Sequence, residues 1–126
     1  MSSKILGLRT TIYKVTEVDA AKEWYTKTFE TPPYFDEPFY VGFDIAGYEL
    51  GLQPEEETEA TNKTANVETY WGVADVVTEF DRFISLGATA HEEPQEVGGG
   101  IIVATVKDPW GNVIGLIHNP HFNLKA

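Results

Sequence analysis

The sequence predicts an α+β fold of two tandem βαβββ modules, whose curved mixed sheets form a concave cleft with the helices outside. Two observations lead to this prediction. The order strand, helix and three strands occurs twice along the 126 residues. The apolar positions of the two expected helices also coincide when one half is shifted by 59 positions, the separation of Thr10 and Thr69. We expect one domain over residues 1–126, with module one at about 5–54, a linker at about 55–66 and module two at about 67–118.

Module one is predicted to begin with a strand at Ile5–Val15, which is rich in β-branched and aromatic residues. A helix then begins at Glu17-Val18-Asp19, because acidic side chains favour the positive N-terminal end of a helix. Thr31-Pro32-Pro33 ends this helix. The three remaining strands are expected at Tyr34–Asp36, Phe39–Ile45 and Tyr48–Gln53.

The stretch at 54–63 (PEEETEATNK) has no apolar residue larger than alanine and carries four glutamates, which is typical of a solvated linker. Module two then repeats the pattern with a strand at Val67–Val73 and a helix from Asp75 that ends at Gly87. Its apolar stripe aligns with that of the first helix, with Phe80 matched to Ala21. The closing strands are expected at Ala90–Val97, Ile101–Val106 and Asn112–Ile117.

The formal charge of −11 comes from 20 acidic and 9 basic residues. Such a surface repels phosphate backbones, so nucleic acid and anionic membranes are poor partners, whereas a cationic small molecule is tolerated or attracted. The absence of cysteine excludes disulfides, thiolate metal sites and cysteine nucleophiles. There is no signal-like N-terminus and no apolar run near the roughly 20 residues that span a bilayer, so we expect a cytoplasmic protein.

Three motifs in order carry a family resemblance. Lys107–Leu116, with its Asp-Pro-Trp-Gly-Asn turn, resembles the closing hairpin of the vicinal-oxygen-chelate superfamily, which includes glyoxalase I, bleomycin-resistance proteins and dioxygenases. Glu17–Phe29 is similar to the first strand-to-helix passage of that family, and Gly47–Leu52 to the closing strand of its first module. The resemblance extends from about Leu6 to His118.

Metal-dependent members of this family supply ligands from the first and last strand of each module. The matching positions here are Thr10, Gly51, Thr69 and Gly115. A hydroxyl is a poor ligand and glycine has no side chain, whereas a transition metal needs three or four donors. Only Glu49 lies nearby, so we expect no metal and no cofactor. The resemblance then favours the metal-free, bleomycin-resistance-type members, which are homodimers that hold a drug in a groove.

Strand alternation predicts which side chains face the cleft. Trp71 is the first candidate for stacking on a ligand, against ordinary packing in the core or a dimer interface. Glu49 is a candidate partner for a cationic ligand and a weak candidate for a catalytic base. Gly51 and Gly115 either allow a bulky ligand or a partner strand to approach closely, or mark a bulge or a repacked core. The full set of expected ligand-binding residues is Trp71, Thr10, Thr69, Glu49, Gln53, Gly51, Gly115 and Ile12.

Three functions are compatible with these features. The first is metal-independent binding of a small apolar or cationic molecule, in a homodimer. The second is a glyoxalase-like lyase or isomerase with a non-standard site and Glu49 as general base. The third is a structural or regulatory dimer whose cleft is filled by its own side chains. His91, beside Glu92 and Glu93, is expected to be a surface residue.

Overall fold

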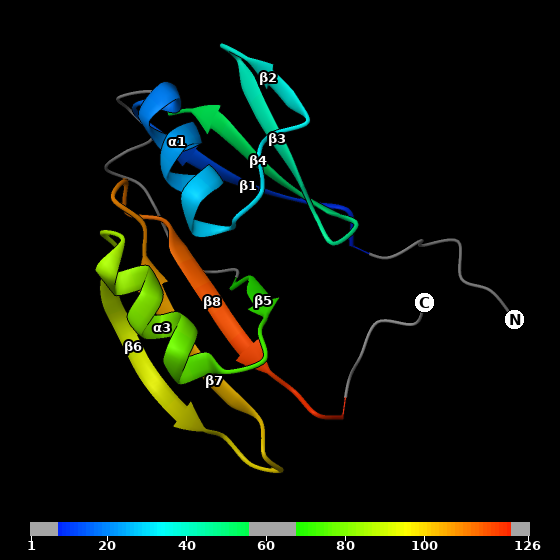
Figure 1. The fold of residues 1–126 in the computed structure, drawn as a ribbon, viewed down its shortest axis with the longest axis vertical. Coiled ribbons are helices and arrows are strands. Elements are labelled where there is room, and N and C mark those ends of the chain that lie inside the picture. Colours follow the sequence, from blue (N-terminus) through cyan, green and yellow to red (C-terminus); the bar gives the residue numbers. More distant parts are fainter. Residues whose placement is uncertain (1–7, 56–67, 122–126) are drawn as a thin grey trace, which may run out of the picture. The chain divides into compact units, whose positions relative to one another are not determined.

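The computed structural model describes residues 8–55 and 68–121, which form two compact units divided at Thr61 and Asn62 (Figure 1). In its described residues, each unit has one helix and one four-stranded mixed sheet, in the order strand, helix and three strands. The prediction of two βαβββ modules is therefore confirmed. Nearly all of the expected linker lies outside the described residues. That the two sheets share a concave cleft stays a prediction.

Module one has a sheet in the order β1-β4-β3-β2, in which β1 and β4 are parallel and the other pairs antiparallel. Helix α1 begins after Glu17 and runs along one face of this sheet. Its bounds and those of the strands are β1 Thr10–Val15, α1 Val18–Thr28, β2 Phe35–Glu37, β3 Tyr40–Ile45 and β4 Tyr48–Pro54.

Tyr25 of α1 fills the centre of this module and is fully buried. Its ring centroid lies 5.9 Å from that of Tyr13 on β1 and 6.4 Å from that of Phe43 on β3. Aromatic rings at such separations contribute packing beyond their buried area. The face of the sheet that packs against α1 also carries the buried residues Val15, Val41, Leu50 and Leu52. The opposite face, called here the helix-free face of module one, carries Thr10, Ile12, Tyr40, Gly42, Asp44, Glu49, Gly51 and Gln53.

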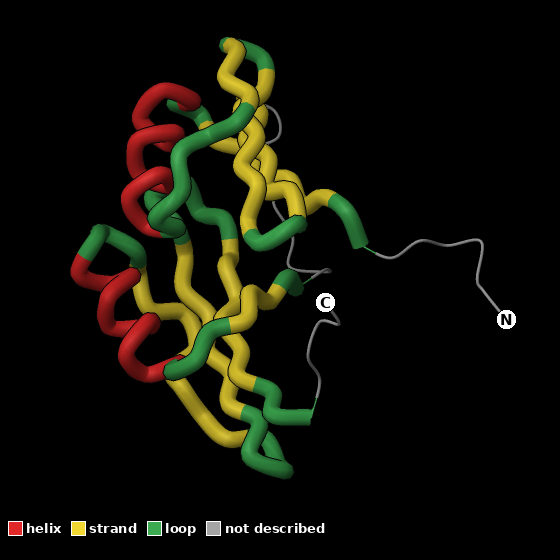
Figure 2. Tube along the Cα trace, turned by 45° about the vertical axis from the view of Figure 1, so that its right-hand side comes forward, coloured by secondary structure: helices red, strands yellow, loops and turns green. Residues whose placement is uncertain are grey.

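Module two repeats this topology, with the sheet order β5-β8-β7-β6 and β5 parallel to β8 (Figure 1). Figure 2 shows the helix of each module in red beside strands in yellow. Its elements are β5 Tyr70–Gly72, α3 Val76–Ser85, β6 Thr89–Glu96, β7 Ile102–Lys107 and β8 Val113–His118. Asp75 caps α3, because its side chain accepts a hydrogen bond from the Thr78 backbone N–H at 3.1 Å. The chain leaves this helix through Gly87, whose φ of 111° is the left-handed conformation expected there.

The turn between β7 and β8 is built around the carboxylate of Asp108, which is buried. It accepts hydrogen bonds from the backbone N–H of Trp110 at 2.9 Å and of Asn112 at 2.7 Å. The Asn112 side-chain amide donates a third bond at 2.9 Å. These bonds satisfy the buried carboxylate and fix the path into β8.

The register of module two corrects one expectation. Gly115 pairs with Tyr70 on β5, and Trp71 pairs with Leu116. Paired residues point to the same side of a sheet, so Trp71 lies on the face that carries the buried Leu116 and not on the face of Gly115. The expectation that Trp71 and Gly115 share a face is wrong, because the aligned repeat was one residue out of step in this strand.

Within the described ranges, neither helix has the length and apolar character needed to cross a membrane.

Candidate ligand-binding site

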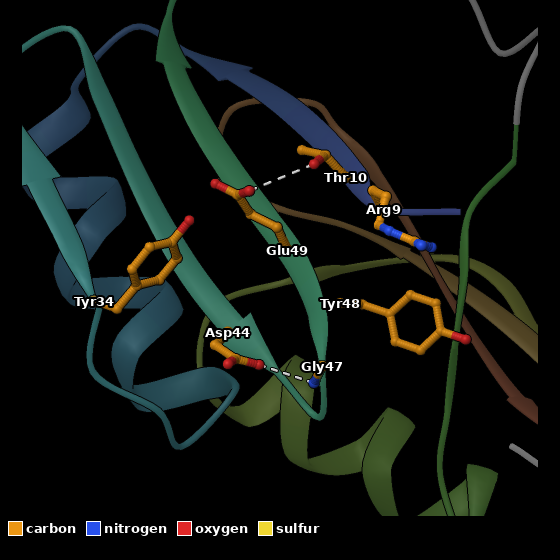
Figure 3. Close-up of a pocket in the computed structure, with 7 residues that line it drawn as sticks. All are labelled: Arg9, Thr10, Tyr34, Asp44, Gly47, Tyr48 and Glu49. Carbon is orange, nitrogen blue, oxygen red and sulfur yellow. Dashed lines mark hydrogen bonds between the residues drawn. The ribbon is translucent and has the colours of Figure 1, made fainter. Parts of the chain in front are cut away.

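A pocket of about 240 Å³ opens on the helix-free face of module one, where β1 and β4 begin and β3 ends (Figure 3). The hairpin turn at Gly47 closes one end, and the Asp44 carboxylate holds this turn by accepting the Gly47 backbone N–H at 2.8 Å. The lining residues are Arg9, Thr10, Tyr34, Asp44, Gly47, Tyr48 and Glu49. The pocket thus combines two aromatic rings with two carboxylates and one guanidinium.

Glu49 is the centre of the polar contacts in this region. Its Oε2 accepts a hydrogen bond from the Tyr40 hydroxyl at 2.8 Å, and its Oε1 accepts one from the Thr10 hydroxyl at 3.4 Å. Figure 3 shows the Tyr34 hydroxyl directed toward the same carboxylate. Glu49 is half-buried, so these hydroxyls hold its charge in one position while leaving part of it accessible.

The Glu49 carboxylate contributes to raised pKa values of Tyr34 and Tyr40. Hydrogen bonding to Glu49, with smaller effects of burial and of nearby negative charge, raises the pKa of Tyr34. Partial burial, followed by the hydrogen bond to Glu49, raises the pKa of Tyr40 far above its ordinary value. Both hydroxyls therefore keep their protons at neutral pH and act as donors to the carboxylate.

Gly51 does not leave an open space for a ligand. A side-chain carbon added there would lie 2.6–2.7 Å from ring carbons of Tyr40, and its position would also meet the Tyr40 hydroxyl. Gly42, which pairs with Gly51, is covered in turn by Glu49 and by the rings of Tyr34 and Tyr40. The close approach that glycine permits is thus made by the sheet's own tyrosine.

In module two, a tyrosine ring likewise covers a glycine of the sheet. The ring of Tyr70 lies across Gly115, where an added carbon would be 2.5 Å from a ring carbon and 2.6 Å from the Thr69 carbonyl oxygen. That carbonyl accepts the Gly115 backbone N–H at 2.9 Å. The Tyr70 hydroxyl donates to Glu68 at 3.3 Å. Thr69 therefore contributes its backbone here, and the tyrosine fills the space that was expected to admit a ligand or a partner strand.

Of the residues expected to bind ligand, Thr10 and Glu49 line the pocket. Ile12, Gly51 and Gln53 lie on the same helix-free face of module one, as predicted. Thr69, Trp71 and Gly115 belong to module two. The ligand-binding role of each residue stays a prediction.

Tyr34 and Tyr40 were not in the expected ligand-binding set, since burial in a core or dimer interface was favoured for the aromatic residues of this stretch, although a signal for Tyr40 exists. In β3 the buried Val41 and Phe43 alternate with Tyr40, Gly42 and Asp44, which places Tyr40 on the helix-free face. No pattern marks Tyr34, which precedes β2 and reaches the pocket only because its backbone N–H donates to the Gly42 carbonyl at 2.9 Å.

No three His, Asp or Glu side chains converge as metal ligands within residues 8–55 and 68–121. Of the four positions matched to the family's metal ligands, Gly51 is paired with Ile12, Gly115 with Tyr70 and Thr10 with Glu49. The fourth, Thr69, accepts the Gly115 backbone N–H at its carbonyl oxygen.

Tandem βαβββ modules define a recognised class of α+β protein, and the comparisons identify its family. The family model described as Glyoxalase/Bleomycin resistance protein/Dioxygenase superfamily matches residues 7–116, and the chain belongs to this superfamily. No protein with a curated description matches the sequence.

Several solved structures share the fold. A glyoxalase-related enzyme from Fulvimarina pelagi has a TM-score of 0.77 at 16% identity, covering 97% of this chain and 94% of that one. A bleomycin resistance determinant encoded on the transposon Tn5 has a TM-score of 0.70 at 15% identity, covering 90% and 98%. A lactoylglutathione lyase from Agrobacterium tumefaciens has a TM-score of 0.69 at 18% identity, covering 96% and 99%. At these identities the similarity establishes the fold alone.

Proposed function

We propose that the protein binds a small cationic aromatic molecule in the pocket of module one, without a metal, and that Glu49 is its counter-charge. The observation that carries this proposal is the Glu49 carboxylate, held by the hydroxyls of Tyr40 and Thr10 beside an open pocket. The Tyr34 side chain is 63% exposed and offers its ring at the pocket edge. A carboxylate next to aromatic faces is the combination that attracts an organic cation.

The charge balance supports a cation over an anion. Glu49 and Asp44 outnumber Arg9 in the lining, and the whole chain has a formal charge of −11. The field of the protein therefore raises the local concentration of cations. A bleomycin resistance determinant is among the solved structures that share the fold. Sequestration of a drug by a homodimer, as expected from the sequence, is therefore a physiological role consistent with this proposal.

A lyase with Glu49 as general base is the alternative. Each carboxylate oxygen has two lone pairs, so Glu49 can accept the Tyr40 and Thr10 hydroxyls and still present a lone pair to a substrate proton. Turnover of a hemithioacetal that disappears in Glu49→Gln would establish this alternative.

The proposal is tested by calorimetric titration with benzyltrimethylammonium, a permanent cation, and with benzyl alcohol as its neutral counterpart. We expect the cation to bind and Glu49→Gln to weaken its binding by at least about tenfold, because a charged partner is lost. Bleomycin is the second probe.

Glu23→Gln is the matched control, since Glu23 is an exposed residue of α1, on the other side of the sheet. It makes the same change in net charge and should leave affinity within about twofold. Equal affinity of Glu49→Gln and the wild type for the cation would contradict the proposal.

A further inference from the structure

A second hydrogen-bonded cluster lies in module two and is not used by the function proposed above. The Thr105 hydroxyl oxygen is 2.9 Å from Glu92 Oε1 and 2.9 Å from His91 Nδ1. Thr105 is only 1% exposed, whereas His91 and Glu92 are exposed. Thr105 pairs with Gly115, so the cluster lies on the face of the sheet opposite the buried Ala104, Val106 and Leu116, called here the helix-free face of module two.

An irregularity in β6 brings these groups together. Neighbouring residues of a regular strand point to opposite faces, so His91 and Glu92 could not both reach one hydroxyl. The register between β6 and β7 shifts between Ala90 and Glu92, and again between Glu92 and Gln95. Bulges of this kind redirect side chains and are common beside functional sites.

The protons of the cluster can be assigned by donor counting. A threonine hydroxyl has one proton, and an ionised carboxylate can only accept. The hydroxyl proton therefore goes to Glu92, and the oxygen accepts a hydrogen bond from Nδ1–H of His91. In the neutral ring, Nε2 is then left as an exposed hydrogen-bond acceptor. Burial and the restricted rotation of a β-branched side chain keep the Thr105 hydroxyl in this position.

The surroundings indicate which molecules this acceptor can bind. The helix-free face of module two carries the half-buried Val103, Val113 and Ile117, which give it an apolar floor. Burial and the negative charges of Glu68 and Glu92 raise the pKa of Tyr70 on the same face. Two carboxylates repel an anion, and an imidazole acceptor needs a donor, so the site suits a neutral aromatic molecule with an O–H or N–H group.

We propose that His91, held by Thr105 and Glu92 in the tautomer that presents Nε2, is the acceptor of a second ligand site for neutral aromatic O–H or N–H compounds. Nitrogen-15 NMR of the full chain tests this directly, with phenol as the probe and anisole as its counterpart without a donor. His91→Gln identifies the His91 signals. In the neutral wild-type ring Nδ1 carries the proton, and phenol shifts the Nε2 signal whereas anisole does not.

Thr105→Val keeps the shape of the buried side chain and removes the hydroxyl. It should shift the neutral ring toward the Nε2–H form and weaken phenol binding roughly fivefold, as expected for one neutral hydrogen bond. Glu92→Leu, at an exposed position, tests the same link if the threonine variant does not fold. A protonated Nε2 in the neutral wild-type ring, or equal responses to phenol and anisole, would overturn the proposal. Glu49→Gln should leave the phenol response unchanged, which separates this site from the pocket of module one.

Discussion

Single side chains determine how much of each sheet face remains available to a ligand. On the helix-free face of module one, Tyr40 covers Gly51 and donates to Glu49, so one residue both fills space and orients a charge. Strand alternation identified Glu49 from the sequence, because the period of two is a local property. The contact between Tyr40 and Glu49 joins two strands, and its geometry depends on a register that no local pattern specifies.

The raised pKa of Tyr40 predicts a pH dependence of stability. Burial and the hydrogen bond to Glu49 favour the protonated phenol in the folded state. Above about pH 10 the unfolded chain loses this proton while the folded chain keeps it, so the unfolding free energy falls as the pH rises. Urea unfolding should show up to about 1 kcal/mol of this loss at about pH 11, and Tyr40→Phe should remove that part. An identical alkaline decline in the variant would show that Tyr40 does not contribute.

Gly115 and Gly72 offer a matched pair of substitutions in module two. An alanine carbon at Gly115 would approach a backbone oxygen, which cannot move aside as a side chain can, whereas the carbon at Gly72 has nothing within 4 Å. We expect Gly115→Ala to lower the unfolding free energy by about 1–3 kcal/mol and Gly72→Ala to change it by less than about 0.5 kcal/mol. Denaturant unfolding measures both, and equal effects would argue against the close packing at Gly115.

Helices and strands follow from the sequence where the signals are local. The order of the elements within residues 8–55 and 68–121 and the cap at Asp75 were predictable from apolar period and capping chemistry. The error at Trp71 arose because the repeat was aligned on the helices and extended to a strand that is only three residues long in the described chain. A shift of one residue in that strand moves every one of its side chains to the opposite face of the sheet.

The two helices begin differently, which gives a second matched test. The Asp75 side chain accepts the Thr78 N–H, whereas Glu17 at the start of α1 makes no such bond. Asp75→Ala should therefore lower the melting temperature by roughly 2–5 °C, and Glu17→Ala should change it much less. The Thr78 bond lowers the pKa of Asp75, so its stabilisation is present above the ordinary aspartate pKa and is lost as the pH falls through the folded-state value. Equal effects of the two substitutions at neutral pH would contradict this account.

At the level of the entire chain, the family is established, but membership of the family does not determine which ligand is bound or which reaction is catalysed. The superfamily named by the matching model includes glyoxalases, bleomycin resistance proteins and dioxygenases, which differ in what they do on one fold. The positions matched to the metal ligands of metal-dependent members are Thr and Gly in this sequence, and this is the basis for proposing metal-independent binding.

The metal content of the purified protein directly tests the expectation that binding is metal-independent. Untagged protein purified without chelator should contain far less than one divalent ion per chain by elemental mass spectrometry, and adding Zn²⁺ or Mn²⁺ should not raise its melting temperature. About one tightly held ion per chain would make an enzyme with unexpected ligands the better description.

The tyrosine ring over Gly51 also restricts the order in which the sheet of module one can change during evolution. A larger residue at Gly51 is tolerated only after Tyr40 has been replaced, because the ring occupies the space first. At Gly115 the Thr69 carbonyl oxygen blocks a larger residue whether or not Tyr70 is present. Replacing Tyr40 alone leaves a ring-sized hollow on the face of the sheet, which makes the protein less stable but able to admit a flat molecule. In module one, a new binding specificity is thus one substitution away at the tyrosine and two at the glycine.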